Sequence, residues 1–260
     1  MQEEIDFARR FGGVARLYGA EGLAKLQAAH ICVIGIGGVG SWAAEAVVRN
    51  AVGAITLVDL DNIAESNVNR QLHALNGAFG KAKVSAMAER IKLINPLVRV
   101  IEIEDFVSPE NINNLLNQHY DGIIDCIDDA KAKAAIAAYC KTNKTPLVMT
   151  GAAGGRIDAT RIKQADLSQV SHDKLLAKVR NLLRRDYAFA KASSAKPTKL
   201  GVSCVYSDEE TIKPVATCDA ENSAITGLNC AGYGSSVCVT AAFGFAAAGL
   251  LLQQVLQKSV

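Results

Sequence analysis

The stretch Ile31-Cys-Val-Ile-Gly-Ile-Gly-Gly-Val-Gly40 decides the fold class of this chain. Its first four residues are a continuous apolar run that ends in glycine, as buried parallel strands do. The glycines that follow match G-x-G-x-x-G and precede a stretch of helical character over 41–50: Gly35, Gly37, Gly38 and Gly40. The first glycine of such a motif permits a tight turn, the second lets a phosphate approach the backbone, and the third lets the helix pack closely. The stretch therefore predicts a nucleotide-binding turn between a strand and a helix.

The same alternation of strand and helix continues along the chain. Further apolar runs predict strands over 54–59, 98–103, 122–127 and 146–150, and helical periodicity predicts helices over 83–94, 109–117 and 130–141. Alternation over about 120 residues is typical of an α/β fold with a doubly wound, Rossmann-like, mostly parallel sheet. After the glycine-rich segment 151–155 the pattern changes, because residues 156–165 alternate as an antiparallel strand does. We therefore expect residues 1–155 to form the nucleotide-binding half, and residues 156–260 to be a C-terminal extension of the same domain with antiparallel character.

Composition excludes some classes of protein. Half of the 260 residues are hydrophobic and the net charge is only +2, so the chain is not an intrinsically disordered one. The seven cysteines include no C-x-x-C pair, which indicates reduced thiols rather than a disulfide framework. The N-terminal residues are acidic and lack the apolar core of a signal peptide, so we expect a cytoplasmic protein.

Two C-terminal segments differ in composition from the chain as a whole. Residues 174–199 hold eight basic side chains and one acid, and include a predicted amphipathic helix. Residues 222–257 have no charged side chain, and 237–252 are almost wholly apolar. A membrane span would need about 20 apolar residues, but several glycines and serines interrupt this run, so we favour a final buried helix and leave membrane association open.

Polar residues follow the second predicted strand. Asp59 ends it, 19 residues after Gly40, where an acid can bind the ribose hydroxyls. The next segment carries further candidate ATP-binding residues: Asp61, Asn67, Arg70, Gln71 and Lys83. An NAD dehydrogenase has no need of an arginine and a lysine near the phosphates, whereas an enzyme that breaks ATP at the α-phosphate needs cations to offset the developing charge. We therefore favour ATP chemistry over hydride transfer.

Carboxylates follow the strand predicted over 122–127. An acid at the carboxyl end of a parallel strand lies at the ligand crevice, where it can hold Mg²⁺, or it can cap the next helix. We expect Asp128 to serve the metal and Asp129 to serve the cap.

This set of residues resembles the superfamily of ubiquitin-activating-type adenylyltransferases, which includes the bacterial activators of molybdopterin and thiamine sulfur carriers. The resemblance runs from about Arg10 to Gly155 and returns near the C-terminus. It implies that ATP and Mg²⁺ are bound and AMP is transferred to a carboxylate, with Arg70, Lys83 and Asp128 catalytic. It also implies a homodimer.

The sequence departs from that superfamily at two places. The sulfur-carrier activators carry two C-x-x-C pairs for a structural zinc, and the cysteines here are too widely spaced, so we expect no such zinc. The superfamily also has an N-terminal arginine that reaches ATP across the dimer, and this chain has glycine at that position. Arg10 or Arg16 is the candidate substitute.

Further stretches resemble one branch of the superfamily that acts on a modified tRNA nucleoside. They include Arg10-Phe-Gly-Gly13, Asn69-Arg-Gln-Leu-His-Ala74 and Gly201-Val-Ser-Cys-Val-Tyr-Ser207. The resemblance implies ATP-dependent cyclisation of N6-threonylcarbamoyladenosine beside the tRNA anticodon, through adenylation of the threonyl carboxylate. The alternatives are an adenylyltransferase for a ubiquitin-like sulfur-carrier protein and a catalytically inactive binding subunit. If tRNA is the substrate, we expect its contacts on the basic segment, at Lys178, Arg180, Arg184 and Arg185.

Two further residues have alternative interpretations. The resemblance connects the branch to a cysteine desulfurase, so Cys204 is a candidate sulfur acceptor, although a small buried side chain on a strand is the interpretation we favour. His73 follows Arg70 and Gln71, and either contacts the ligand or makes a local hydrogen bond to the loop backbone.

Overall fold

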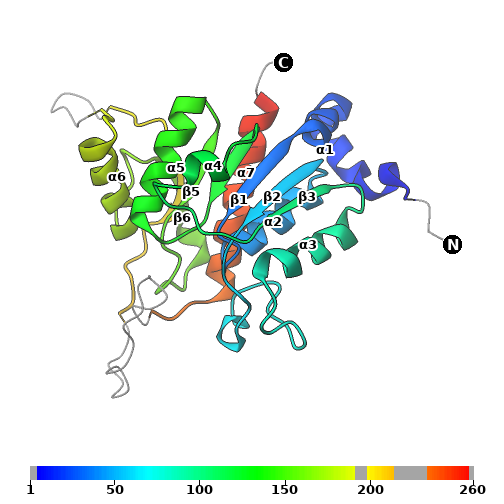
Figure 1. Ribbon diagram of the computed structural model, residues 1–260, viewed down its shortest axis with the longest axis horizontal. Coiled ribbons are helices and arrows are strands. Elements are labelled where there is room, and N and C mark those ends of the chain that lie inside the picture. Colours follow the sequence, from blue (N-terminus) through cyan, green and yellow to red (C-terminus); the bar gives the residue numbers. More distant parts are fainter. Residues whose placement is uncertain (1–4, 191–197, 214–232, 258–260) are drawn as a thin grey trace.

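A seven-stranded sheet forms the centre of the computed structural model, which describes residues 5–190, 198–213 and 233–257 (Figure 1). The strands lie in the order β3-β2-β1-β4-β5-β7-β6, and every neighbouring pair is parallel except β6 and β7. Their bounds are β1 His30–Ile34, β2 Ala54–Val58, β3 Arg99–Ile103, β4 Gly122–Asp125, β5 Leu147–Thr150, β6 Ile162–Asp166 and β7 Ser203–Ser207. The predicted mostly parallel α/β sheet with an antiparallel C-terminal part is confirmed.

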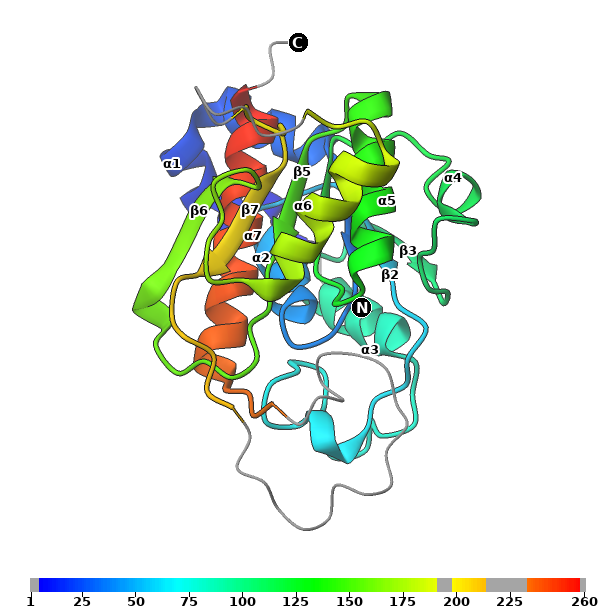
Figure 2. The ribbon, with the colours of Figure 1, turned by 90° about the vertical axis from the view of Figure 1, so that its left-hand side faces the viewer.

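Helices cover both faces of the sheet, as the two ribbon views show (Figures 1 and 2). Alternate residues of β1 serve the two cores: Ile31 and Val33 belong to one cluster of buried side chains, and Cys32 and Ile34 to the other. The first core is shared with α1, α2, α3 and α7, and the second with α4, α5 and α6. Their bounds are α1 Phe7–Ala28, α2 Gly40–Arg49, α3 Lys83–Ile94, α4 Ile112–Leu115, α5 Ala130–Asn143, α6 Lys174–Asp186 and α7 Val237–Gln257, with short 3-10 turns η1 Glu65–Asn67 and η2 Ala159–Arg161.

The strand order reverses between β1 and β4. The chain proceeds outward from β1 through β2 to β3 and then returns to place β4 on the other side of β1. In doubly wound sheets ligands bind in the crevice at the carboxyl ends of the strands that flank such a reversal. The glycine turn after β1 and the acidic segment after β4 therefore meet at one place.

Three elements differ from the sequence predictions. The helix expected over 109–117 is only Ile112–Leu115, because Asn111 accepts from the backbone N–H of Ser108 at 2.8 Å and forms a turn there instead. The strand expected from residue 156 begins at Ile162, after Asp158 caps the turn η2. Helix α1 was not predicted at all: its weak apolar pattern buries few side chains, and it kinks at Gly19, where φ is 76°.

Helix α7 is the apolar C-terminal segment. By length and composition it is the one helix of the described residues that could cross a membrane. Of its most apolar 18-residue stretch, 56% is buried inside the protein. It packs against α2, α1 and strands β4, β5 and β7, with Val239, Phe243, Ala247 and Leu251 fully buried. These contacts are those of a core helix, and the length criterion alone is weak evidence for a membrane span.

Candidate active site

A cavity of about 710 Å³ opens at the carboxyl ends of β1, β2 and β4. Most of the predicted ATP-binding residues line it: Gly35, Gly37, Gly38, Asp59, Asp61, Arg70, Gln71, Lys83 and Asp128. Gly40 and Asn67 do not form its wall and have supporting roles. The structure thus brings the residues that the sequence separates by more than ninety positions into one site.

The glycine turn has the geometry that its motif predicts. Gly35 adopts a φ of +84°, which is costly for any residue with a side chain. A Cβ atom on Gly40 would lie 1.7 Å from the carbonyl oxygen of Gly35, so only glycine lets α2 begin this close to the turn. The N-terminus of α2 therefore lies against the cavity, where its backbone N–H groups favour a phosphate.

Asp59, Asp61 and Lys83 form a charged cluster on the β2 side of the cavity. The Nζ of Lys83 lies 2.6 Å from Oδ2 of Asp61 and 3.8 Å from Oδ1 of Asp59. Asp59 also accepts hydrogen bonds from the backbone N–H groups of Ile36, at 2.6 Å, and of Asp61, at 2.9 Å. Burial raises the pKa of Asp59 despite the nearby Lys83 ammonium. The bond from Ile36 ties the end of β2 to the glycine turn, so the acid for the ribose and the phosphate-binding turn are fixed relative to each other.

Arg70 lies on the loop that follows β2. Its Nη1 donates to the carbonyl of Ser66 at 2.9 Å and to Oδ1 of Asn69 at 3.0 Å, and burial lowers its pKa. The indole N–H of Trp42 donates to the Arg70 carbonyl at 3.1 Å. The Oδ1 of Asn67 accepts from the backbone N–H of Ala64 at 3.0 Å. In this geometry Asn67 shapes the loop and Arg70 faces the cavity.

Polar atoms in the same loop are buried without hydrogen-bond partners in the part of the chain that the structure describes. They are Oε1 of Gln71 and both ring nitrogens of His73. His73 therefore makes no local hydrogen bond of the predicted kind, and burial, with the Lys83 charge second, lowers its pKa to about 4. A neutral imidazole is buried in the loop, and Gln71, which lines the cavity, has a buried oxygen without a partner among the described residues.

The acidic residues at the end of β4 and just after it make different contacts. Asp129 caps α5 by accepting from the backbone N–H of Ala132 at 2.7 Å. Asp125 and Lys133 form a fully buried ion pair with 3.0 Å between Nζ and Oδ1. Burial raises the pKa of Asp125. Asp128 is exposed and lines the cavity, as the exposed Asp61, Glu110 and Asp129 also do.

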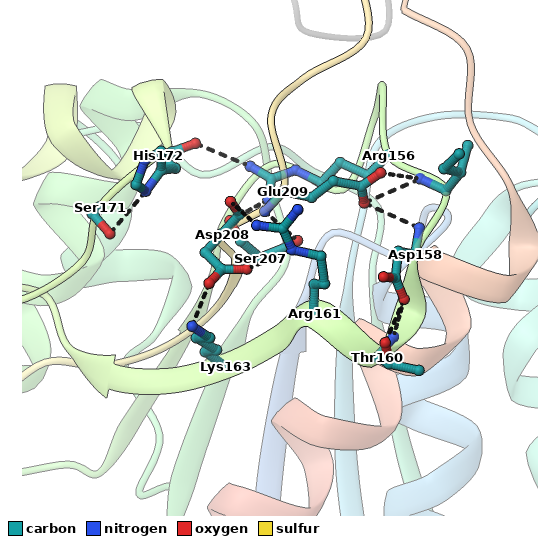
Figure 3. A network of polar contacts seen from close by, with 11 residues as sticks. Arg156, Asp158, Thr160, Arg161, Lys163, Ser171, His172, Ser207, Asp208 and Glu209 are labelled. Atoms are coloured by element: carbon teal, nitrogen blue, oxygen red, sulfur yellow. Dashed lines mark hydrogen bonds and ion pairs between the residues drawn. The ribbon is translucent and has the colours of Figure 1, made fainter.

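A second wall of the cavity comes from the C-terminal half and was missed by the sequence analysis. Arg156 lines the cavity, is 2% exposed, and donates to the carbonyls of Ser207 and His172 (Figure 3). Its Nη2 lies 3.5 Å from Oδ2 of Asp173. The same carboxylate accepts from the backbone N–H groups of Ala152 and Leu176, both at 2.9 Å. The only sequence signal for this network was an arginine directly after a glycine-rich segment.

The cysteines offer no metal cluster among the described residues, which contain no group of three or more possible metal ligands. Cys218 and Cys230 lie outside those residues. Cys204 is fully buried on β7, and burial raises its pKa, which supports the structural interpretation over the sulfur acceptor. Cys126 lines the cavity, and burial raises its pKa to about 12.

The structure also shows the environment of the basic residues predicted to contact tRNA and of the two candidates for the cross-dimer arginine. On α6, Lys178 and Arg185 are exposed, whereas Nη1 of Arg180 donates to the carbonyls of Leu167 and Val170 and Nε of Arg184 donates to that of Ala190. Lys191 and Lys196 lie outside the described residues. On α1, Arg10 donates to the carbonyls of Leu93 and Ile94 at the end of α3, and Arg16 is exposed. These roles as tRNA contacts and as the cross-dimer arginine stay predictions.

Comparisons with known proteins place the chain in a family. The chain is 48% identical over 254 residues to the tRNA threonylcarbamoyladenosine dehydratase of Haemophilus influenzae, over 97% of this chain and 95% of that protein. The crystal structure of E. coli tRNA N6-threonylcarbamoyladenosine dehydratase, TcdA, in complex with ATP superposes with a TM-score of 0.87 and 45% identity, covering 98% of this chain and 97% of that one. The molybdopterin-synthase adenylyltransferase of Salmonella typhimurium is 29% identical over 58% of this chain and 59% of that protein. The model of the ThiF family matches residues 10–259, and the chain therefore belongs to the ThiF family.

Proposed function

We propose that this protein is an ATP-dependent enzyme that dehydrates N6-threonylcarbamoyladenosine beside the tRNA anticodon, closing the threonylcarbamoyl group into a ring. The observation that carries the proposal is the single cavity in which Arg70, Lys83 and Asp128 surround a glycine turn. The likeness to TcdA, whose structure was solved with ATP, extends over almost the whole chain and supports the same chemistry.

The reaction needs activation of a carboxylate. The threonyl carboxylate is a poor electrophile, so its oxygen first attacks the α-phosphorus of ATP, which forms an acyl adenylate and releases pyrophosphate. An oxygen or nitrogen of the neighbouring carbamoyl group then attacks the activated carbonyl, and AMP leaves with the carboxylate oxygen. The attack is intramolecular, so proximity supplies much of the rate and no nucleophile from the protein is required.

The residues of the first wall have corresponding roles. Asp59 accepts from the ribose hydroxyls, while Lys83 and Arg70 offset the negative charge that develops at the α-phosphate. Gln71, with its unpartnered oxygen, and the N-terminus of α2 complete the nucleotide site. Gly40 and Asn67 act indirectly, by holding the helix and the loop.

Asp128 fits a magnesium ion. It is an exposed carboxylate at the cavity wall, next to the glycine turn, and Mg²⁺ is commonly held by one or two carboxylates together with substrate phosphates. The ion would neutralise phosphate charge and favour departure of pyrophosphate.

We also propose that the enzyme is a cytoplasmic homodimer, as its superfamily resemblance implies. Both candidates are exposed, and Arg16 is the better one for the cross-dimer arginine because Arg10 already donates to the carbonyls at the end of α3. Sedimentation of the purified protein as a monomer at micromolar concentration would contradict the dimer.

An isotope experiment tests the reaction. The protein is incubated with ATP and tRNA whose threonyl carboxylate carries ¹⁸O. The proposal predicts one AMP and one pyrophosphate per nucleoside converted, with one ¹⁸O atom in the AMP. Label in inorganic phosphate, with ADP as the product, would mean phosphorylation instead. Conversion of a sulfur-carrier protein to its adenylate, with no change in the tRNA, would favour the alternative substrate.

A further inference from the structure

A second hollow, of about 630 Å³, lies beside the active-site cavity. It runs along α6 and is lined by Lys131, Lys174, Ala177, Lys178, Asn181, Leu182 and Arg185. Lys131, at the start of α5, and Lys174, at the start of α6, line both this hollow and the cavity. The two hollows are therefore adjacent. We call the second hollow the α6 groove.

The polar residues that α6 contributes to the groove follow helical spacing. Lys174, Lys178, Asn181 and Arg185 stand at positions i, i+4, i+7 and i+11, so they share one face. All four are exposed, whereas the apolar residues of α6 are buried: Leu175, Leu176, Val179, Leu182 and Leu183. The stripe extends over about 16 Å at the helical rise per residue. It is long enough for several consecutive charges of a polymer.

Two of the three cations of the stripe have no ion-pair partner within the part of the chain that the structure describes. Neither Lys174 nor Lys178 forms an ion pair there, and Arg185 pairs with Asp186, its neighbour in sequence. Arg180 belongs to another face, since its guanidinium is held by two backbone carbonyls. Of the four arginines and lysines expected to contact tRNA, the groove contains two, Lys178 and Arg185, and it adds Lys131 and Lys174.

The groove is fixed to the cavity wall by the network around Asp173. This residue caps α6 immediately before Lys174, accepts from the backbone of Ala152 in the cavity wall, and pairs with Arg156. The basic stripe therefore has a set position relative to the site where the carboxylate reacts. Such a rigid connection suits a substrate that is held at a distance from its reacting group.

We propose that the α6 groove binds the phosphates of the RNA strand that enters the cavity, so that Lys174, Lys178 and Arg185 position the modified nucleoside. This proposal rests on the proposed tRNA substrate. A row of cations with one amide, without aromatic side chains for base stacking, recognises the backbone and not the base sequence. The groove thus contributes affinity and position, while the cavity selects the modified base.

Variants in the groove test the proposal without touching the cavity. Lys178→Ala, Lys178→Glu and Asn181→Glu change exposed side chains that line the groove alone. We expect Lys178→Ala to reduce the salt dependence of tRNA binding by about one unit of slope. The two glutamate variants should raise the Kd and KM for tRNA on the order of tenfold at physiological salt. The kcat at saturating tRNA and the Kd for ATP should stay as in the wild type.

Lys92→Glu is the matched control. Lys92 is exposed on α3, on the opposite face of the sheet from α6, so the same charge change there should leave tRNA affinity within twofold. Unchanged KM and salt slope in both glutamate variants of the groove would overturn the proposal. A kcat effect with unchanged tRNA affinity would contradict it as well.

The two proposals fail in different ways. If the wild-type protein neither binds nor dehydrates modified tRNA, the proposed function is wrong. If the wild type is active and the groove variants match it, only the assignment of the groove is wrong.

Discussion

The two walls of the active-site cavity use charged side chains in opposite ways. In the first wall, from residues 35–83 and 128, the charged side chains line the cavity, where Lys83 pairs with Asp59 and Asp61. In the second wall, Arg156 and Asp173 are buried and bind carbonyls, backbone N–H groups and each other, and of their polar atoms the Nε of Arg156 has no partner among the described residues. The first wall thus presents charged side chains to the cavity, whereas the charged groups of the second wall mainly bind the backbone and each other. Substitutions in the first should reduce activity, and those in the second should reduce stability.

The largest effect is expected for Lys83→Ala in the first wall. Losing the cation that offsets charge at the α-phosphate should lower kcat/KM about a thousandfold. The free energy of unfolding should change by less than about 1 kcal/mol, because Asp61 is exposed and Asp59 keeps two backbone donors. Steady-state formation of AMP and urea unfolding measure the two quantities. Near wild-type turnover would remove Lys83 from the catalytic set.

The second wall should respond in the opposite way. Arg156→Met leaves the Asp173 carboxylate buried without its cation, and should lower the free energy of unfolding by about 3 kcal/mol. Arg161→Met is the control, because Arg161 forms an exposed pair with Asp208 and should cost less than about 1 kcal/mol. Equal urea midpoints for the two variants would show that burial of the pair has no consequence.

The lowered pKa of His73 predicts how the free energy of unfolding depends on pH. Its pKa is about 4 in the folded protein and about 6.5 when unfolded, so the unfolded chain binds a proton first as the pH falls. Its contribution is complete above pH 6.5 and should decline by about 2 kcal/mol between pH 7 and pH 5. His73→Leu should remove this part of the slope in urea unfolding curves. An unchanged slope would mean that the imidazole is solvated in the folded state.

The smallest effect is expected for Cys204→Ala. Removing one buried sulfur should cost about 1 kcal/mol of stability through the cavity that it leaves. Turnover of tRNA should stay within twofold, since the thiol is inaccessible on β7. Loss of activity with an intact fold would restore the sulfur-acceptor hypothesis.

The difference between the walls also explains which residues of the site can be predicted from the sequence and which cannot. Gly35, Asp59, Lys83 and Asp128 were identifiable because a motif and the ends of successive strands place them at one edge of the sheet. The partners of Arg156 come from residues 172–173 and 207, and depend on β7 lying between β5 and β6. That order follows from long-range pairing, which no local pattern encodes.

Local competition accounts for the other differences. Asn67 resembles a phosphate ligand by its position, yet its Oδ1 accepts from Ala64 and holds the turn η1. Arg180 looked exposed on a basic helix, but two carbonyls of the loop before α6 bind it. Side chains near irregular backbone satisfy that backbone first, and helical periodicity does not reveal this.

Mass spectrometry of tRNA from cells lacking this protein tests the central claim most directly, when the same cells are also supplied with the wild type, Lys83→Ala or Arg161→Met. The account predicts that threonylcarbamoyladenosine loses one water in cells with the wild type or Arg161→Met, and keeps it without the protein or with Lys83→Ala. Dehydrated nucleoside at wild-type levels in the cells without the protein would contradict the account.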